Sequence, residues 1–324
     1  MTAAPLPPAG ALRRIAFLLE RAREPSYRVK AFRTAATIVA ALDDAELDRR
    51  IRTRTLEDLK GIGDKTAGVV LEAHRGEVPT YLQKLEEQYA ELAPLADDAA
   101  ALRAALKGDL HTHSDWSDGG SPIRDMAEAA IAIGHQYLAL TDHSPRLTVA
   151  NGLSPARLER QLDEVAALNE ELKPFRILTG LECDINVDGT LDQTDELLGR
   201  LDVVVASVHS ELRAPRAQMT ERMLAAVANP HTDVLGHCTG RLVIGRQQRN
   251  GTQKPRPESD FDAEAVFAAC VEHGTAVEIN SRPERLDPPR RLLDLAVDVG
   301  CEFAIDTDAH APGQLDWQDA GCVR

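Results

Sequence analysis

The sequence is poor in cysteine and contains no long apolar segment, and both absences narrow what the protein can be. Its five cysteines are scattered and form no C-x-x-C pair, so the sequence indicates neither a disulfide framework nor a thiolate zinc knuckle. We expect them to be reduced and buried. No apolar run is long enough to cross a bilayer, and the opening MTAAPLPPAG lacks the basic-then-apolar pattern of a secretory signal. The sequence therefore predicts a soluble, cytoplasmic protein.

Acidic residues exceed basic ones, and the excess is confined to one part of the chain. The formal net charge is -15, yet residues 1–105 carry equal numbers of basic and acidic side chains, so the excess lies in residues 106–324. This charge argues against a general nucleic-acid clamp in the second part. It is compatible with carboxylates that hold divalent cations. With 43% apolar residues among 324, the chain can form one large domain and a small one.

The first hundred residues are predicted to be helical. The segments ALRRIAFLLERARE and YRVKAFRTAATIVAALDD place apolar residues at spacings of three and four, with a break at Glu24-Pro25. Basic residues outnumber acidic ones within residues 10–42, so we expect a small helical surface with a positive bias. These basic residues are Arg13, Arg14, Arg21, Arg23, Arg28, Lys30 and Arg33.

A glycine-containing turn follows in LEDLKGIGDKTAGVVLEAHRG. Gly61 and Gly63 allow a tight turn, and the free N–H groups of the helix behind it could bind a phosphate; a turn without a ligand is an equal alternative. The pattern resembles a helix-hairpin-helix motif, and residues 11–92 resemble the small N-terminal DNA-binding region of family X DNA polymerases. The resemblance implies that Lys60 and Lys65 contact DNA phosphates.

Short apolar runs alternate with helical segments in the second part of the chain. We expect a small all-α domain over residues 1–92, a linker over 93–106 and an α/β domain over 107–324. The apolar runs are GDLHTH, YLALTDH, RILTGLE, DVVVASVH, DVLGH, TAVEIN and FAIDTDAH. Seven strand–helix alternations indicate a parallel sheet, most simply closed as a distorted TIM-like (β/α)7 barrel.

Nearly every one of these runs ends in a histidine, an aspartate or a glutamate. In parallel barrels the carboxyl ends of the strands meet at one mouth, so these side chains are expected to converge there. His111 and His113 lie two apart on one strand and point to the same side, as a metal-binding pair would. The other histidines considered, His74, His135 and His273, are expected to be structural or exposed. The convergent set is His111, His113, Asp118, His143, Glu182, His209, His237, Asp308 and His310.

The contexts H-T-H-x4-D, T-D-H, G-L-E, S-V-H-S, G-H and D-T-D-A-H resemble the polymerase and histidinol phosphatase (PHP) family of metallophosphoesterases. The stretches SVHSELRAPRAQMTERMLAAVANPHTDVLGHCTGRLVIGRQQ and AVEINSRPERLD are most similar to the PHP domain of bacterial family X polymerases. The resemblance implies a site for three divalent ions, Mn2+ or Zn2+, with Fe2+ as a further candidate. It assigns one ion to His111, His113, Glu182 and Asp308, a second to Glu182, His209 and His237, and a third to Asp118, His143 and His310.

Residues beside the predicted ligands are expected to have other roles. Asp115 is expected to face solvent, Asp142 could orient a histidine, and Asp306 neighbours the preferred ligand Asp308. Four arginines follow the strand ends and are candidates for holding the substrate phosphate, because a guanidinium binds phosphate in a bidentate manner. The alternative is that they are surface or salt-bridge arginines. They are Arg241, Arg246, Arg282 and Arg285.

The sequence therefore predicts a metal-dependent phosphoesterase that acts at DNA 3' ends, as a 3'-phosphatase or a 3'-5' exonuclease of the DNA repair type. One alternative is a small-molecule phosphatase of the histidinol-phosphatase type, and another is a non-catalytic DNA-binding accessory protein with a structural metal cluster. The short linker has no room for a polymerase palm, so polymerase activity is not expected. Only fourteen residues follow His310, where the PHP family normally continues into a closing helix, so the resemblance implies either a truncated chain or an uncovered barrel flank.

Overall fold

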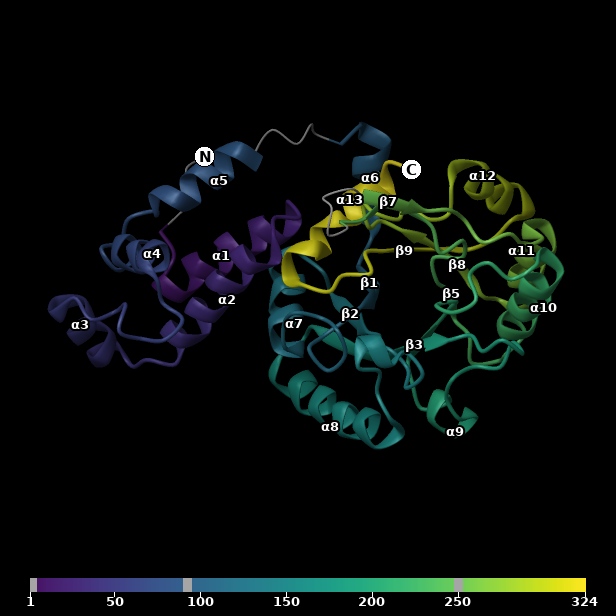
Figure 1. The fold of residues 1–324 in the computed structure, drawn as a ribbon, viewed down its shortest axis with the longest axis horizontal. Coiled ribbons are helices and arrows are strands. Elements are labelled where there is room, and N and C mark those ends of the chain that lie inside the picture. Colours follow the sequence, from purple (N-terminus) through teal and green to yellow (C-terminus); the bar gives the residue numbers. More distant parts are fainter. Residues whose placement is uncertain (1–4, 90–94, 248–252) are drawn as a thin grey trace. The chain divides into compact units, whose positions relative to one another are not determined.

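The structure is a computed structural model that describes residues 5–89, 95–247 and 253–324. The chain divides into two compact units, Met1–Pro94 and Leu95–Arg324 (Figure 1). The expected linker overlaps residues 90–94, which lie outside the described residues. Most of its remainder forms a helix of the second unit, α6 (Asp97–Ala105). Among the described helices, none is long and apolar enough to span a membrane.

The first unit consists of helices, as the apolar spacing predicts. Leu12, Ile15 and Leu19 of the first helix are fully buried, and this helix packs on the second, fourth and fifth. The turn before the fourth helix depends on Gly61, whose φ of 108° is a conformation that glycine adopts readily. The helices are α1 (Pro8–Arg21), α2 (Ser26–Ala40), α3 (Asp44–Thr53), α4 (Asp64–His74) and α5 (Thr80–Tyr89).

Ion pairs reduce the positive bias expected for α1 and α2. Arg33 donates two hydrogen bonds to the Glu20 carboxylate, at 2.8 and 2.6 Å. Arg28 pairs with Glu24. The two acidic residues of this segment thus lie beside two of its arginines, and the net positive surface is smaller than the sequence count indicates.

The second unit is a nearly closed barrel of seven parallel strands, which confirms the predicted distorted TIM-like architecture (Figure 1). Neighbouring strands follow the order β1-β2-β3-β4-β5-β8-β9. Each strand lies within one of the seven apolar runs or adjoins it closely. Their bounds are β1 (Gly108–Thr112), β2 (Tyr137–Leu140), β3 (Arg176–Asp184), β4 (Val203–Ser207), β5 (Val234–Leu235), β8 (Ala276–Asn280) and β9 (Phe303–Asp306).

Helices alternate with the strands and cover the outside of the barrel (Figure 1). Fully buried Leu181, Met219 and Phe267 belong to the main apolar core between strands and helices. All five cysteines are buried and unpaired, as expected. The helices are α7 (Ile123–Ala132), α8 (Pro155–Glu171), α9 (Asp195–Leu198), α10 (Arg216–Val227), α11 (Ala263–His273) and α12 (Arg290–Val299), with short 3-10 turns η1 (Thr148–Ala150) and η2 (Pro312–Trp317).

Buried side chains join the first and last strands of the barrel. The backbone N–H of Leu110 donates to Asp306 Oδ1 at 2.8 Å, and Thr307 Oγ1 donates to Asp109 Oδ2 at 2.5 Å. Burial raises the pKa of Asp109 to about 6. Polar side chains thus supply part of the pairing at the seam where β1 meets β9.

Two short helices cover the barrel flank near the C-terminus, so the alternative of an uncovered flank is wrong. Ala99 of α6 and Cys322 of α13 (Gln318–Cys322) pack together with Ile279, Leu293 and Ile305. The segment before the first strand therefore completes a flank that sequence reading assigned to residues after the last one.

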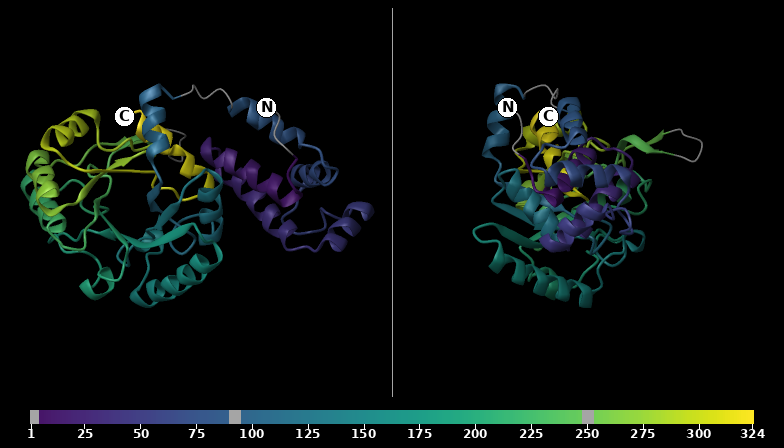
Figure 2. Two further views of the ribbon diagram at one scale, coloured as in Figure 1. Left: turned by 180° about the vertical axis from the view of Figure 1, so that it is seen from behind. Right: turned by 90° about the vertical axis from the view of Figure 1, so that its left-hand side faces the viewer.

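An antiparallel ribbon follows the fifth barrel strand. Its strands, β6 (Leu242–Gln247) and β7 (Gln253–Arg256), place Arg246 opposite Lys254. The right-hand view of Figure 2 shows the ribbon projecting from the barrel. At its base, Arg241 Nε donates to the Arg285 carbonyl oxygen at 3.0 Å, which fixes the ribbon beside the loop after β8.

Candidate metal centre

The structure brings the nine predicted ligands together at the carboxyl ends of the barrel strands. His111 lies in β1 and Glu182 in β3, and the other seven lie in the segments that follow β1, β2, β4, β5 and β9. Parallel strands end at the same edge of a barrel, which is why residues two hundred positions apart can meet. Most of the nine are buried, whereas Asp118 keeps 38% of its side chain exposed and lies at the rim.

Glu182 occupies the centre of the group. Its Oε1 lies 2.8 Å from His237 Nε2 and 3.2 Å from His209 Nε2. Its Oε2 lies 3.0 Å from His143 Nδ1 and 3.3 Å from His111 Nε2. One carboxylate thus faces histidines from four different strand ends, so it can bridge two cations.

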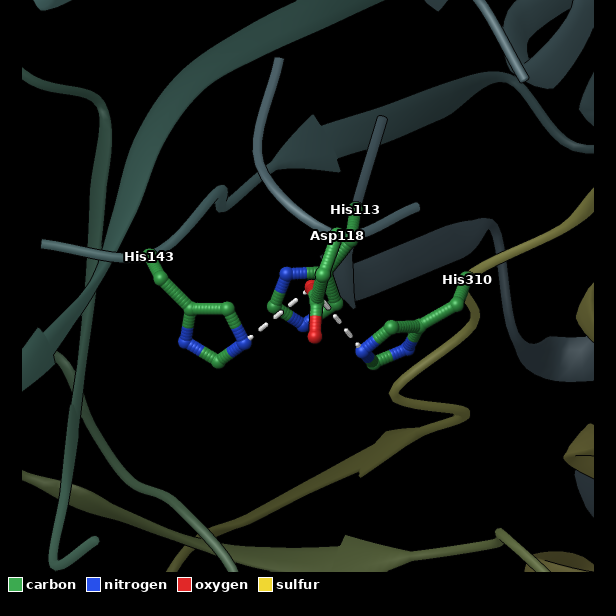
Figure 3. A group of neighbouring side chains, drawn as sticks. All are labelled: His113, Asp118, His143 and His310. Carbon is green, nitrogen blue, oxygen red and sulfur yellow. Dashed lines mark ion pairs between the residues drawn. The ribbon is translucent and has the colours of Figure 1, made fainter. Parts of the chain in front are cut away.

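A second cluster lies around Asp118. Figure 3 shows Asp118 between His143 and His310, with His113 beside them. Asp118 Oδ1 is 3.4 Å from Nε2 of each of the first two histidines. One potential ligand atom from each of the four residues lies within 4.8 Å of the others, close enough to bind one metal ion.

Asp308 completes a third group with His111 and His113, again with potential ligand atoms within 4.8 Å of one another. Asp308 Oδ1 lies 3.4 Å from His113 Nε2. The backbone of Asp308 has a φ of 53°, which a residue with a side chain rarely adopts. Strain of this kind persists where the surrounding structure holds a functional side chain in place.

Buried atoms without hydrogen-bond partners indicate that the group fits cations. Among the described residues these atoms include His111 Nε2, His143 Nδ1, both ring nitrogens of His113, and Glu182 Oε2. Leaving such atoms unpaired in the interior is costly unless something binds them. Imidazole nitrogens combined with a few carboxylate oxygens form a donor set suited to Zn2+, Mn2+ and Fe2+. The residues present could therefore hold divalent metal ions.

The contacts between Glu182 and the surrounding histidines shift the pKa values of the group. Burial raises the pKa of its carboxyl, but the surrounding histidines lower it more, so the pKa lies well below its usual range. Burial lowers the pKa of His143, while Glu182 and Asp118 raise it to about 10. Burial and the charges of His310 and His143 lower the pKa of His113 to about 3. The mixture of raised and lowered values reflects acids and histidines packed at ligand distances.

Two carboxylates that were not predicted from the sequence contact the Nδ1 atoms of predicted histidine ligands. Glu278 Oε1 lies 2.6 Å from His111 Nδ1, and Asp184 forms a short hydrogen bond with His209 Nδ1. Glu278 lies in the run TAVEIN, which ends in no predicted ligand, and Asp184 lies two residues after Glu182 on the same strand. The period of two along a strand could have suggested both, because alternate residues share a face.

Asp142 does not orient a histidine, contrary to the possibility raised from the sequence. Its carboxylate accepts hydrogen bonds from Ser114 N at 2.9 Å, Ser114 Oγ at 2.6 Å and Gln161 Nε2 at 2.7 Å, and from Ser117 Oγ. Asp142 therefore holds the loop that carries Asp118. Asp115, in the same loop, is exposed as expected.

The four candidate arginines have different surroundings. Arg285 Nε donates to Asp308 Oδ2 at 2.9 Å, and its buried Nη1 has no hydrogen-bond partner. Arg282 Nη1 lies 3.5 Å from Asp308 Oδ1. Arg241 is engaged with backbone carbonyl groups at the base of the ribbon. The side chain of Arg246 lies outside the described part of the structure, so its role stays a prediction.

The predicted phosphate contacts of the first unit lie on the surface of its helical hairpin. Lys60, Gly61, Gly63 and Lys65 are exposed around the buried Ile62. Thr66 Oγ1 accepts a hydrogen bond from Gly63 N–H at 3.0 Å and so caps α4. Of the histidines set aside, His135 is buried, His273 is exposed, and His74 lies 3.3 Å from Asp48.

Comparison with known protein families identifies the second unit. The model of the PHP domain matches residues 109–282, more than half of the chain. The chain belongs to the PHP-domain family. In this PHP-domain protein, a helix-hairpin-helix domain model also matches residues 7–77. Both resemblances inferred from the sequence are thereby confirmed.

Known relatives of this PHP-domain protein differ in length and in name. The DNA polymerase/3'-5' exonuclease PolX of Bacillus subtilis (strain 168) is 41% identical over 250 residues, which are 77% of this chain and 42% of that protein. The chain thus spans less than half the length of this relative. A probable phosphatase of Thermoanaerobacter sp. (strain X514) is 28% identical over 62% of this chain and 78% of its own length.

A solved structure is similar to this chain. It is the histidinol phosphate phosphatase of Lactococcus lactis, complexed with zinc, L-histidinol and phosphate. It covers 64% of this chain and 87% of its own, with 21% identity and a TM-score of 0.48.

Proposed function

We propose that this PHP-domain protein is a metal-dependent phosphoesterase that hydrolyses phosphate esters at DNA 3' ends, as a 3'-phosphatase or a 3'-5' exonuclease. The coarser activity, hydrolysis of phosphate esters, follows from family membership and from the names of the relatives. One observation supports the DNA substrate most: a helix-hairpin-helix unit and a PHP barrel occur in one chain, and a relative that matches 77% of this chain is named as a DNA polymerase/3'-5' exonuclease.

The nine convergent residues are the proposed ligands of three divalent ions, Mn2+ or Zn2+, with Fe2+ as a further candidate. The first ion is assigned to His111, His113, Glu182 and Asp308, the second to Glu182, His209 and His237, and the third to Asp118, His143 and His310. The close spacing of His111, His113 and Asp308 supports the first ion, and that of Asp118, His143 and His310 supports the third. For the second ion, Glu182 Oε1 lies 3.2 Å from His209 Nε2 and 2.8 Å from His237 Nε2, although Glu182 and His209 also form a group with His143. When bound, such ions supply a nucleophile at neutral pH and offset negative charge on the phosphate.

Side chains near the centre are suited to bind and orient the phosphate. Arg285 already contacts Asp308 through Nε and retains an unpartnered Nη1, so it can donate to a phosphate oxygen while it holds that carboxylate. Arg282 is the second proposed contact because it lies near the same carboxylate. Asp118 lies at the partly exposed rim, where a chain end enters without displacing the buried histidines.

Cationic groups outside the centre support a polymeric anionic substrate. Lys60 and Lys65 flank the helical hairpin, and Lys254 is exposed on the ribbon rooted next to the loop of Arg285. Within residues 241–257 the sequence has five basic residues and no acidic one, although the surrounding barrel is acidic. A strand of DNA is a partner that would use this local charge.

A small-molecule phosphatase is the second candidate. The acidic barrel does not hinder a small substrate, and the relatives named as probable phosphatases are covered over most of their length. This candidate leaves the helix-hairpin-helix unit without a role, which is why the DNA substrate is preferred.

The test uses the full chain loaded with Mn2+ or Zn2+ and three substrates: a 3'-phosphorylated oligonucleotide, the same oligonucleotide with a 3'-hydroxyl, and L-histidinol phosphate. We expect phosphate release from the first or nucleotide release from the second, lost in His111→Ala. Turnover of L-histidinol phosphate alone would establish the second candidate. Ion binding with no hydrolysis of any of the three would favour a non-catalytic DNA-binding accessory protein.

A further inference from the structure

β8 contributes no proposed metal ligand, yet one of its side chains contacts two of the proposed ligands. Glu278, in the middle of β8, is fully buried. Its Oε1 lies 2.6 Å from Nδ1 of His111, and its Oε2 accepts a hydrogen bond from the backbone N–H of His237. A single carboxylate thus touches two strand-end histidines that come from β1 and β5.

Asn280, two residues further along the same face of β8, extends this contact. Its Nδ2 donates to Glu278 Oε2 at 3.2 Å and lies 3.5 Å from Asp308 Oδ2. Glu278 and Asn280 therefore connect proposed ligands from β1, β5 and β9. They form a layer of buried polar contacts behind these proposed ligands.

The contact with Glu278 determines which nitrogen of His111 can bind a cation. A carboxylate oxygen 2.6 Å from Nδ1 favours the tautomer in which the Nδ1–H donates this hydrogen bond. In a neutral imidazole the lone pair then belongs to Nε2, the buried nitrogen that lacks a hydrogen-bond partner and lies 3.3 Å from Glu182 Oε2. Asp184 holds Nδ1 of His209 in the same way.

We propose that Glu278 is a positioning residue, which fixes the ring of His111 with Nε2 free for a divalent ion and ties that ring to the His237 strand end. The proposal rests on the metal binding in the proposed function but not on the identity of the substrate. Glu278 is a buried carboxylate, and its hydrogen-bond partners are a histidine, an amide and a backbone N–H. Cations bound to that histidine would also stabilise its negative charge.

The test is Glu278→Gln in the full chain, with Zn2+ and Mn2+ affinities measured by competition against a chelating indicator. Gln keeps the size of the side chain but removes its charge and can turn an amide N–H toward Nδ1. We expect at least one ion to bind about 10- to 100-fold more weakly. Unchanged affinity and stoichiometry for every ion would overturn the proposal.

Asp287→Asn is the matched control, because Asp287 is also a fully buried carboxylate, and it bonds to Thr239 rather than to a histidine. We expect its ion affinities to match those of the wild type. If Glu278 were merely structural, Glu278→Gln would lower the stability of the chain stripped of ions and leave its ion affinities unchanged. Should Glu278→Gln fail to fold, Glu278→Asp tests the same contact, since it keeps the charge and withdraws the oxygen from Nδ1.

The outcomes separate this inference from the proposed function. A wild type that binds ions but hydrolyses no phosphate ester would refute the function, and the affinity of Glu278→Gln would still decide the role of Glu278. A wild type that binds no divalent ion would refute both.

Discussion

Asp142 is expected to be one of the most sensitive positions in the barrel although it binds no proposed ion. Its buried carboxylate accepts hydrogen bonds from Ser114, Ser117 and Gln161. In Asp142→Ala the serine hydroxyls can turn toward other acceptors, but the Ser114 N–H and the Gln161 amide stay buried without partners. At about 1–3 kcal/mol for each unsatisfied group, we expect a loss of about 4 kcal/mol in the free energy of unfolding.

Urea-induced unfolding, followed by circular dichroism, measures this loss. Asp115→Ala is the control because Asp115 is an exposed acid in the same loop, and we expect it to change stability by less than about 0.5 kcal/mol. Asp142→Ala should also bind fewer ions, since the loop it holds carries Asp118. A loss below about 1.5 kcal/mol, with full ion binding, would refute the assignment of Asp142 as the anchor of this loop.

Three further substitutions test other parts of the account. Burial and Arg103 lower the pKa of His135 to about 4, so between about pH 4 and 6.5 the unfolded chain binds more protons than the folded chain and stability falls as the pH drops. In urea unfolding, His135→Gln should remove about 3 kcal/mol of this pH dependence. Stability curves against pH that run parallel for the wild type and the variant would contradict this expectation. Gly119→Ala places a Cβ 2.6 Å from the Ser114 carbonyl oxygen and should lower the free energy of unfolding by about 1–3 kcal/mol in the same assay. The Cβ of Gly120→Ala lies 3.6 Å from its nearest neighbour, so this control variant should be tolerated. Equal stability of the two variants would argue against the close packing of Gly119. Lys254→Glu should reduce the slope of DNA affinity against salt concentration by about one phosphate contact, as measured by fluorescence anisotropy. Lys173→Glu, an exposed change elsewhere on the barrel, should leave this slope unaltered. Identical slopes for the two variants would show that the ribbon is not part of the DNA interface.

The fold and the convergence of the nine side chains could be predicted from the sequence because both follow from periodicity. Parallel strands end at one edge, and a polar residue just after an apolar run must lie there. His111 and Asp308 are far apart in the chain, yet their contexts alone place them at the same mouth. Fixing which atoms approach Glu182 required coordinates, because side-chain directions depend on the loops that follow each strand.

Other features could not be predicted because they depend on contacts between distant segments. Asp142 is adjacent to His143, and the sequence raised the possibility that it orients a histidine; the structure directs its carboxylate toward Ser114 and Gln161 instead. The positive surface of α1 and α2 was overestimated because a charge count does not show that Glu20 binds Arg33 across two helices. The closing flank was misjudged because α6 precedes the barrel in sequence but packs beside its last strand.

The number of divalent ions bound per chain is the decisive measurement for the proposed metal centre. The full chain, stripped with chelator and then dialysed against Mn2+ or Zn2+, would be analysed by inductively coupled plasma mass spectrometry, with Glu182→Gln beside the wild type. We expect up to three ions per wild-type chain, clearly fewer in Glu182→Gln, and phosphoester hydrolysis that disappears and returns with the ions. Less than one ion per wild-type chain, or hydrolysis that persists after the ions are removed, would contradict this expectation.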